Sequence, residues 1–396
     1  MKKIFTITFV AVSSFIFSCK KETTISNEST AVSSMEVTSA LHSGTSTSPL
    51  VWQVCMGTTA DEYGFAVAKA GDGGYFVVGT TNGNHDGYFA KLDNNHLVKN
   101  TGVVGGSGVE NLHGVVSTDD GGCLAVGATS SSETPGFMDG SDMFLVKIDV
   151  NGAVQWQKAI GIPGSQQANT IIRTSDGNFA LTGYSDAQLP FIKIDPAGNV
   201  LQQVYFSYSP ATTANFGYGI VQTGNDYIVS GWTHVPNNTA EDGLLLVKFV
   251  SDGTITPARF YTGFDSHGWG IVSNSGGSDF TIVGDNGNMV LLKVRPDLSK
   301  IYDKTFSNMD GRSIVSIPDG YLIVGTQSNN LMAFRVDNNF NTISDNTFGG
   351  GRVETGRSVI VDTDGGYVAI GTTNSTNGIV TGNHGGNDIW TVKVKY

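Results

Sequence analysis

Charged side chains are scarce in this sequence, and the positive ones are the scarcer. Only 15% of the 396 residues are charged, with 23 Lys and Arg against 35 Asp and Glu, and the formal net charge is −12. A nucleic-acid partner needs a concentrated basic face that displaces counterions from its phosphates. The charge balance therefore excludes nucleic acid from the expected partners.

Proline and cysteine are also few, whereas glycine is abundant. The chain has 10 Pro and 3 Cys but 52 Gly, a balance typical of many short strands joined by tight turns. Beyond the N-terminal segment only Cys55 and Cys123 remain, in repeats that are separated by another repeat. We therefore expect two buried thiols and no disulfide.

The apolar run at the N-terminus, residues 4–17, is too short to span a membrane comfortably as a helix. It follows a short basic start, which is typical of a cleaved targeting segment. Ile16 to Cys19 resembles the lipobox of bacterial lipoproteins, which implies that Cys19 is the lipid attachment site. We expect residues 1–18 to be a signal peptide and residues 19–48, rich in Ser and Thr, to be a flexible tether. These features predict a lipid-anchored protein of the bacterial cell envelope. We expect it in the outer membrane, on either the periplasmic or the surface side.

A strand-like sequence motif that ends in Gly, called here the repeated phrase, occurs seven times along the rest of the chain. The closing glycines lie 48, 56, 48, 53, 41 and 46 residues apart. A period near fifty, built from short β runs, is the signature of a β-propeller. We predict an all-β, seven-bladed propeller over residues 49–396. The seven phrases are DGGYFVVG (72–79), DGGCLAVG (120–127), DGNFALTG (176–183), NDYIVSG (225–231), SDFTIVG (278–284), DGYLIVG (319–325) and DGGYVAIG (364–371).

Each repeat continues with an alternating strand, a turn and an outer strand, so that a blade has four antiparallel strands from the axis outward. The last repeat lacks an outer strand of its own. Residues 50–57 (LVWQVCMG) match residues 154–161 (VQWQKAIG), the outer strand of the second blade. We predict that the N-terminal strand completes the last blade and leaves no unpaired edge at the seam.

The motif in residues 364–393, which contains Thr381-Gly382-Asn383-His384-Gly385-Gly386, resembles the bacterial DGGY-type β-propeller repeat lipoproteins. The resemblance covers residues 49–396 and implies the propeller fold and an envelope location. It implies no particular ligand. Blades four to six depart from the family pattern, since Val250 and Arg295 replace the Asp that follows the third strand.

Repetition separates scaffold residues from candidate site residues. A group found in most blades is expected to be structural, as for Glu62, Glu110 and Glu354, which we expect to hydrogen-bond the loop that enters the first strand. The recurring basic residues of the third strand are expected to lie across neighbouring strands. They are Lys91, Lys147, Lys193, Lys248, Lys293, Arg335 and Lys393.

At one position the blades disagree, with six residue types among the seven blades. It lies just before the small residue that opens the first strand, where the seven side chains would ring the axial mouth. Aromatic, amide, imidazole and guanidinium groups that converge there could bind a sugar, a carboxylate or a peptide end. The alternative is a plug that fills the channel and orders water. The seven residues are Phe65, His113, Asn169, Tyr218, Trp269, Arg312 and Arg357.

Three loops on the same face are long, at residues 128–142, 232–243 and 372–388, and long loops on a rigid scaffold often bind ligands. His85 and His384 lie in related loops and could hold a metal with Asp86 and Asp388, although turn chemistry explains them as well. We predict no metal and no cofactor. The carboxylates of the long loops are Glu133, Asp139, Asp142, Glu241 and Asp242.

The sequence has no nucleophile elbow, no His-Glu-x-x-His and no phosphate-binding loop. Our leading hypothesis is a non-catalytic binding or assembly module for a glycan or an envelope protein. The alternatives are a carbohydrate-active enzyme, a glycoside hydrolase or lyase that uses the loop carboxylates, and a structural envelope scaffold without a small ligand. Fold alone does not decide among them.

Overall fold

The structure is a computed structural model. It describes residues 50–82, 85–208, 214–234, 242–256, 258–261, 267–274, 277–285 and 287–395. The expected signal peptide, the lipid-bearing Cys19 and the tether of residues 19–48 lie outside the described residues. Among the described residues no helix is long and apolar enough to cross a membrane.

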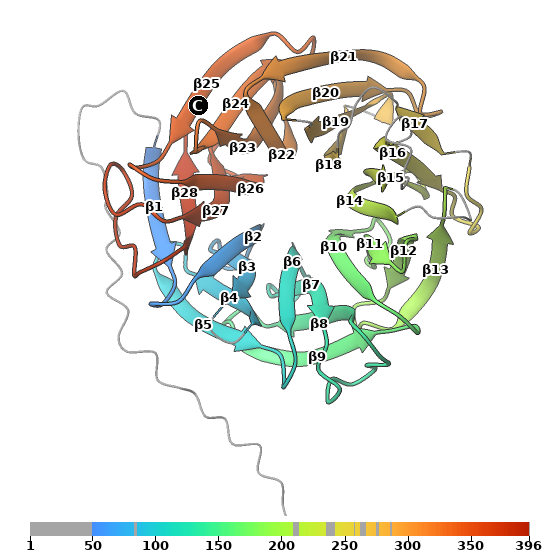
Figure 1. The fold of residues 1–396 in the computed structure, drawn as a ribbon, viewed down its shortest axis with the longest axis horizontal. Coiled ribbons are helices and arrows are strands. Elements are labelled where there is room, and N and C mark those ends of the chain that lie inside the picture. The colour runs from blue at the N-terminus through green and yellow to red at the C-terminus, as the bar shows by residue number, and fades with distance from the viewer. Residues whose placement is uncertain are drawn as a thin grey trace, which may run out of the picture. The chain divides into compact units, whose positions relative to one another are not determined.

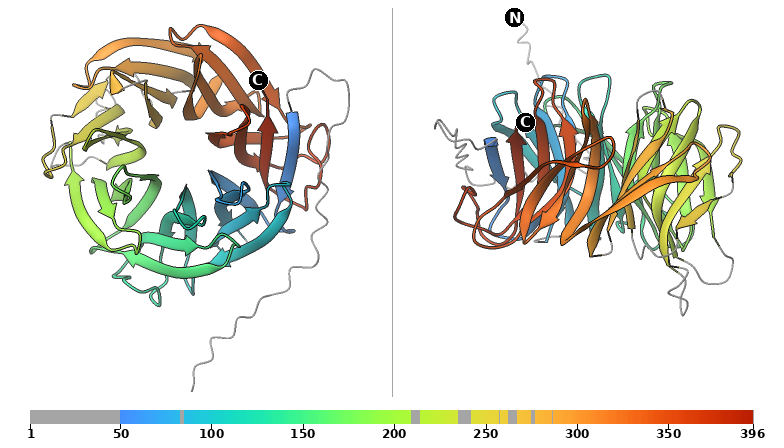
Figure 2. Two further views of the ribbon diagram at one scale, coloured as in Figure 1. Left: turned by 180° about the vertical axis from the view of Figure 1, so that it is seen from behind. Right: turned by 90° about the horizontal axis from the view of Figure 1, so that it is seen from above.

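Over this part of the chain, 28 strands form seven four-stranded antiparallel sheets that follow one another around a central opening (Figures 1 and 2). The predicted seven-bladed propeller is thereby confirmed. Blade 1 is β2 (Glu62–Lys69), β3 (Tyr75–Thr81), β4 (Asp86–Leu92) and β5 (Val98–Val104); blade 2 is β6 (Glu110–Ser117), β7 (Cys123–Thr129), β8 (Asp142–Ile148) and β9 (Val154–Ile160). Blade 3 is β10 (Gln166–Arg173), β11 (Phe179–Ser185), β12 (Leu189–Ile194) and β13 (Val200–Phe206); blade 4 is β14 (Ala214–Thr223), β15 (Asp226–His234), β16 (Gly243–Phe249) and β17 (Arg259–Tyr261). Blade 5 is β18 (His267–Ser273), β19 (Phe280–Asp285), β20 (Asn288–Val294) and β21 (Lys300–Ser307); blade 6 is β22 (Met309–Ile317), β23 (Gly320–Gln327), β24 (Asn330–Asp337) and β25 (Thr342–Phe348); blade 7 is β26 (Glu354–Val361), β27 (Tyr367–Thr373), β28 (Asp388–Val394) and β1 (Leu50–Met56).

The cores lie between blades. The two middle strands of a blade are buried on both faces, as the continuous burial of β7 and β8 shows, and they read as near-continuous apolar runs for that reason. One cluster joins Leu124 and Val126 of blade 2 to Phe179 and Leu181 of blade 3, and similar clusters fill the other junctions. Cys55 and Cys123 are buried, free thiols in two such clusters, as expected.

The ring closes as predicted, because β1 pairs antiparallel with β28 and supplies the outer strand of blade 7. The loop between β27 and β28 folds against this closing strand (Figure 1). Thr381 of the loop accepts a hydrogen bond from Gln53 of β1, and Val380, 1% exposed, packs in the same apolar cluster as Cys55. The loop therefore contributes to closure.

The loop between β7 and β8 behaves in the same way. The Pro135 carbonyl accepts a hydrogen bond from the Ala159 N–H of β9 at 2.8 Å, and Thr134 is buried. Both of these long loops thus lie against the outer strand of their own blade. Most of the third long loop, residues 235–241, is outside the described part of the chain.

The recurring basic residues have carboxylate partners. Lys91 pairs with Asp72 at 2.8 Å, so that the third strand is tied to the turn that opens the repeated phrase. The same tie recurs in five other blades, and in blade 5 Lys293 donates to the Asn338 carbonyl of the next blade at 2.7 Å. The five pairs are Lys147–Asp120, Lys193–Asp176, Lys248–Asp226, Arg335–Asp319 and Lys393–Asp364.

The recurring glutamates hold the loops as predicted. Glu110, fully buried at the start of β6, accepts from the Gly106 N–H at 2.9 Å and from the Thr129 hydroxyl at 2.7 Å. Glu62 and Glu354 do the same in blades 1 and 7. The first strand of each of these blades is therefore anchored to the loop that enters it.

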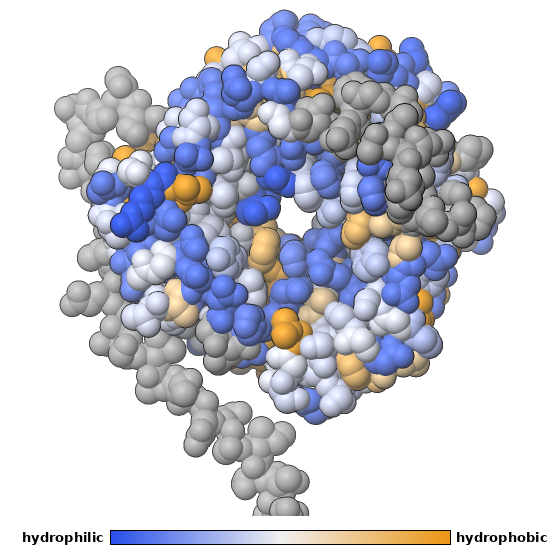
Figure 3. Space-filling model, in the orientation of Figure 1, coloured by the Kyte–Doolittle hydropathy of each residue, from blue (hydrophilic) through white to orange (hydrophobic). Residues whose placement is uncertain are grey.

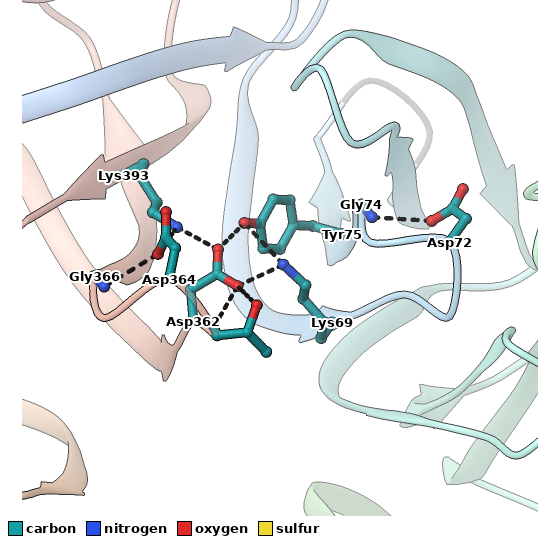
Figure 4. A network of polar contacts seen from close by, with 9 residues as sticks. Lys69, Asp72, Gly74, Tyr75, Asp362, Asp364, Gly366 and Lys393 are labelled. Atoms are coloured by element: carbon teal, nitrogen blue, oxygen red, sulfur yellow. Dashed lines mark hydrogen bonds and ion pairs between the residues drawn. The ribbon is translucent and has the colours of Figure 1, made fainter.

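A buried polar network ties blade 7 to blade 1 beside the seam (Figure 4). Asp362, in the turn after β26, accepts from Lys69 of β2 at 2.5 Å and also from Tyr75 of β3 and Lys393 of β28. Lys393 also pairs with Asp364 at 2.7 Å. Burial alone would raise the pKa of Asp362, but these donors hold it well below its usual range.

Candidate ligand-binding channel

The seven variable residues all occupy one structural position, a β-bulge in the innermost strand of each blade. In blade 1, Gly64 faces Gly79 and Ala66 faces Val78, so that Phe65 has no partner on β3. The same shift recurs at the other six positions. A bulge turns its extra residue out of the ladder, and here each one is turned toward the axis.

This placement corrects the sequence analysis in one respect. The residues were expected at the opening of the strand, at its mouth, but the bulges lie inside the strands, as with Phe65 in β2 (Glu62–Lys69). The ring of side chains is therefore set within the channel.

The seven side chains line one continuous cavity along the axis. One section, of about 300 Å³, is lined by the whole ring together with Gln167. The adjoining section, of about 220 Å³, is lined by the ring and by the small residues that follow it, such as Gly114, Gly219 and Ser358. Figure 3 shows the hollow at the centre, with hydrophilic residues over much of the surface around it. The predicted convergence of the seven residues is confirmed; that they bind a ligand stays a prediction.

Blades 5 and 6 contribute a compact group around Arg312. Its guanidinium lies 4.0 Å over the Trp269 ring and pairs with Asp310 at 2.8 Å and Asp285 at 3.5 Å. The Trp269 N–H donates to Asp285 at 2.6 Å. Burial opposes ionisation of both carboxyls: the Trp269 and Arg312 contacts outweigh it at Asp285, whose pKa is lowered, whereas it prevails at Asp310, whose pKa is raised.

Blades 7, 1 and 2 contribute a second group around Arg357. Phe65 and His113 are stacked with ring centroids 4.4 Å apart, and the Arg357 guanidinium lies 5.9 Å from the Phe65 ring. Burial and the Arg357 charge lower the pKa of His113 to about 4, so that its imidazole is neutral at pH 7. Burial and the charge of Arg312 also lower the pKa of Arg357. Within the described part of the chain, no carboxylate lies within ion-pair distance of Arg357.

The remaining members of the ring are neutral hydrogen-bonding groups. Asn169 donates to the Gly217 carbonyl at 2.9 Å and accepts from Gln167 at 2.8 Å. The Tyr218 ring lies against Trp269 in a tilted arrangement, with centroids 4.4 Å apart. Burial raises the pKa of the Tyr218 hydroxyl to about 12, so that it stays protonated. The channel can thus offer neutral polar atoms beside a guanidinium.

The structure locates most of the loop carboxylates. Four are described, and none of these four lines the channel. Each accepts a hydrogen bond from its own surroundings: Glu133 from Ser107, Asp139 from the Gly164 N–H, Asp142 from the Met138 N–H and Asp242 from His234. Glu241 lies outside the described residues.

His384 belongs to a turn. Its N–H and Nδ1 both contact the buried Asp388 carboxylate, at 2.7 and 2.9 Å. His85 adopts a left-handed backbone with φ 59°, and its carbonyl accepts from the Glu110 N–H. Over the described ranges no three His, Cys, Asp or Glu side chains are grouped to hold a metal ion.

Sequence reasoning missed Asp285, Asp310 and Gln167, which are the partners of the ring. It also missed the signal that marks the bulges, which is the closing Gly of the repeated phrase. A Cβ atom at Gly127 would lie 1.9 Å from the Asn111 carbonyl oxygen, because the bulge at His113 brings that carbonyl against the neighbouring strand. The corresponding distance is 1.6 to 1.9 Å at five of the other closing glycines and 2.6 Å at Gly284.

No family model matches the sequence, and no curated protein matches it. Among solved structures the chain is similar to BamB from Moraxella catarrhalis, at 10% identity and a TM-score of 0.49, over 86% of this chain and 93% of that one. It is also similar to the β-propeller domain of Cps50 (Swd1) from Myceliophteria thermophila, at 10% identity and a TM-score of 0.54, over 86% of this chain and 98% of that one. The second likeness is one of fold alone, and it agrees with the propeller.

Proposed function

We propose that the protein is a non-catalytic binding module whose site is the axial channel. The observation that carries this proposal is the ring of bulges: one backbone feature is repeated seven times, and it presents six different side-chain types, Arg twice, to one cavity. The scaffold positions repeat Lys, Glu and Gly, as structural roles require. A channel plug would need only bulk, whereas this ring carries two guanidinium groups and several neutral polar groups.

The partner we propose is a glycan or a protein of the cell envelope. We further propose that Cys19 carries a lipid, which anchors the propeller to a membrane through the segment of residues 19–48, as in the DGGY-type propeller lipoproteins that the sequence resembles. The N-terminal segment and the resemblance support this part of the proposal.

Catalysis by the loop carboxylates is the weaker alternative. Asp142 is fully buried and accepts the Met138 N–H at 2.5 Å, and Asp139 and Glu133 bind backbone N–H groups of neighbouring loops. These contacts give the three carboxylates a structural use, and none of the three lines the channel.

The experiment is binding of the purified protein to a glycan array and to a peptide array. The variant is Arg312→Ala with Arg357→Ala. The matched control is Arg173→Ala with Arg352→Ala, two exposed arginines that do not line the channel. We expect the parent protein to bind a ligand, the Arg312 and Arg357 double variant to lose that binding, and the control double variant to keep it. Binding that survives the loss of Arg312 and Arg357 would remove the channel from consideration, and product release from a polysaccharide panel would favour the enzyme.

A further inference from the structure

The two arginines of the channel are not equivalent. Arg312 is compensated by two carboxylates, Asp310 at 2.8 Å and Asp285 at 3.5 Å. Arg357, in the same cavity, has no carboxylate within ion-pair distance among the described residues, and its nearest aromatic ring is Phe65 at 5.9 Å. In a protein of net charge −12, a guanidinium that solvent reaches and no carboxylate pairs is available to an anion.

The ring residues of blades 1 to 4 do not compete for Arg357. His113 is neutral at pH 7 because burial and the Arg357 charge lower its pKa to about 4. Phe65, Asn169 and Tyr218 carry no charge. An anion that entered the ring would find neutral groups beside Arg357 on the side of blades 1 and 2, and on the side of blade 6 it would find Arg312, whose charge Asp310 and Asp285 compensate. In this narrow cavity the pair with Arg357 is less screened than at an open surface.

The aromatic rings do not offer a platform for a sugar. Trp269 is covered by Arg312 at 4.0 Å, by Tyr218 at 4.4 Å and by His267 at 4.7 Å. Phe65 is covered by His113 at 4.4 Å. Since protein groups lie against Trp269 on several sides and against one face of Phe65, recognition in the channel falls mainly to the guanidinium and the neutral polar atoms.

We propose that Arg357 binds a carboxylate, and that this carboxylate is the C-terminus of a peptide segment that enters the channel. A carboxylate matches the planar fork of a guanidinium through two parallel hydrogen bonds. The ring section of about 300 Å³ and the adjoining section of about 220 Å³ have room for the end of a chain but not for a folded surface. This inference rests on the proposed function and specifies its ligand.

The test compares N-acetyl-triglycine with N-acetyl-triglycinamide, which differ only in the terminal carboxylate, by titration calorimetry of the full chain at low ionic strength. We expect the acid to bind at least tenfold more tightly than the amide, and added salt to weaken the acid alone. Arg357→Gln should weaken the acid at least tenfold. Arg173→Gln, which removes the same charge from an exposed pair with Asp119, should leave it unchanged.

Equal affinity for the acid and the amide, or equal losses in the two variants, would overturn the inference. Arg357-dependent binding of glucuronate in preference to N-acetyl-triglycine would overturn the peptide and assign the carboxylate to a glycan. If neither peptide binds but the arrays show channel-dependent binding of another ligand, the inference fails and the proposed function stands. If the arrays are blank as well, both fail. Thermal melting of Arg357→Gln close to that of the parent protein establishes that the variant is folded.

Discussion

Of the side chains on the closing strand β1, we expect Trp52 to contribute most to the stability of the closed ring. It lies opposite Lys393 on β28, is 1% exposed and stacks on His96 of blade 1 with centroids 4.4 Å apart. His96 holds a left-handed backbone with φ 67° at the turn between β4 and β5. The indole thus joins the closing strand to the next blade.

The matched control is Trp156, which lies opposite Lys147 on β8 in the equivalent register. It packs over Gly198 of blade 3, the counterpart of His96, and is only half-buried. Truncation of a fully buried Trp to Ala costs about 3–5 kcal/mol, and we expect about half of that for Trp156. Since the Trp52 N–H has no partner in the described structure, no hydrogen bond adds to the loss.

The assay is thermal unfolding of the two variants beside the parent protein. An unfolding entropy of about 2.1 cal/mol/K per residue amounts to roughly 0.7 kcal/mol/K for a domain of this size. A loss of 4 kcal/mol, about the middle of that range, then lowers Tm by about 5–6 °C. Trp156→Ala should lower Tm by roughly half as much. Equal losses in the two variants would refute the idea that the closing strand is held more firmly than an ordinary outer strand.

Three further substitutions have expected signs. Asp362→Asn should destabilise the fold by about 3 kcal/mol at pH 7 because it breaks the buried pair with Lys393. The pKa of Asp362 is lowered in the folded protein, so its contribution to stability is present above pH about 4 and is lost as the pH falls further. Denaturant titrations of the parent and the variant should therefore give converging stabilities in acid. Asp388→Asn should raise the stability at pH 7, because burial raises the pKa of Asp388 and its Oδ1 has no partner within the described residues. The gain should disappear below pH about 4, and a gain that persists there would contradict the charge argument. Gly127→Ala should lower the denaturation midpoint by the equivalent of about 3 kcal/mol, whereas unchanged stability would mean that the bulge at β6 relaxes freely.

The architecture was predictable because each blade needs the same strands, turns and glycines, so the same sequence pattern recurs. Trp52 and Trp156 lie in matching segments at distant places in the chain, so that the closing strand could be recognised by its likeness to another outer strand. The Lys–Asp ties were not predicted, although both residues recur, since the sequence does not say which strand end meets which turn. In blade 5, Lys293 instead contacts the Asn338 carbonyl of the next blade, although Asp279 holds the place in the phrase that Asp226 holds in blade 4.

The candidate site was predicted in composition but not in geometry. The seven residues were found because they vary, but a bulge is a property of strand register, which a single strand does not reveal. The long loops were expected to frame a binding face, which stays a prediction; in the two that are described throughout, Val380 and Thr134 are buried, a contribution to the fold that was not predicted. Loop length did not distinguish a loop that binds a partner from one that closes the fold.

In each blade, strand pairing and the chemistry of the channel depend on different residues. Because the closing glycine has no Cβ atom, the carbonyl of the neighbouring strand can approach it closely and the strands stay paired. The residue that projects into the channel, such as Arg357 or Asn169, has no part in that pairing. Substitutions there can change the chemistry of the channel one blade at a time while the hydrogen-bond ladder stays intact. A propeller of this kind can therefore acquire a new ligand through a few point mutations at seven separate, nearly independent positions.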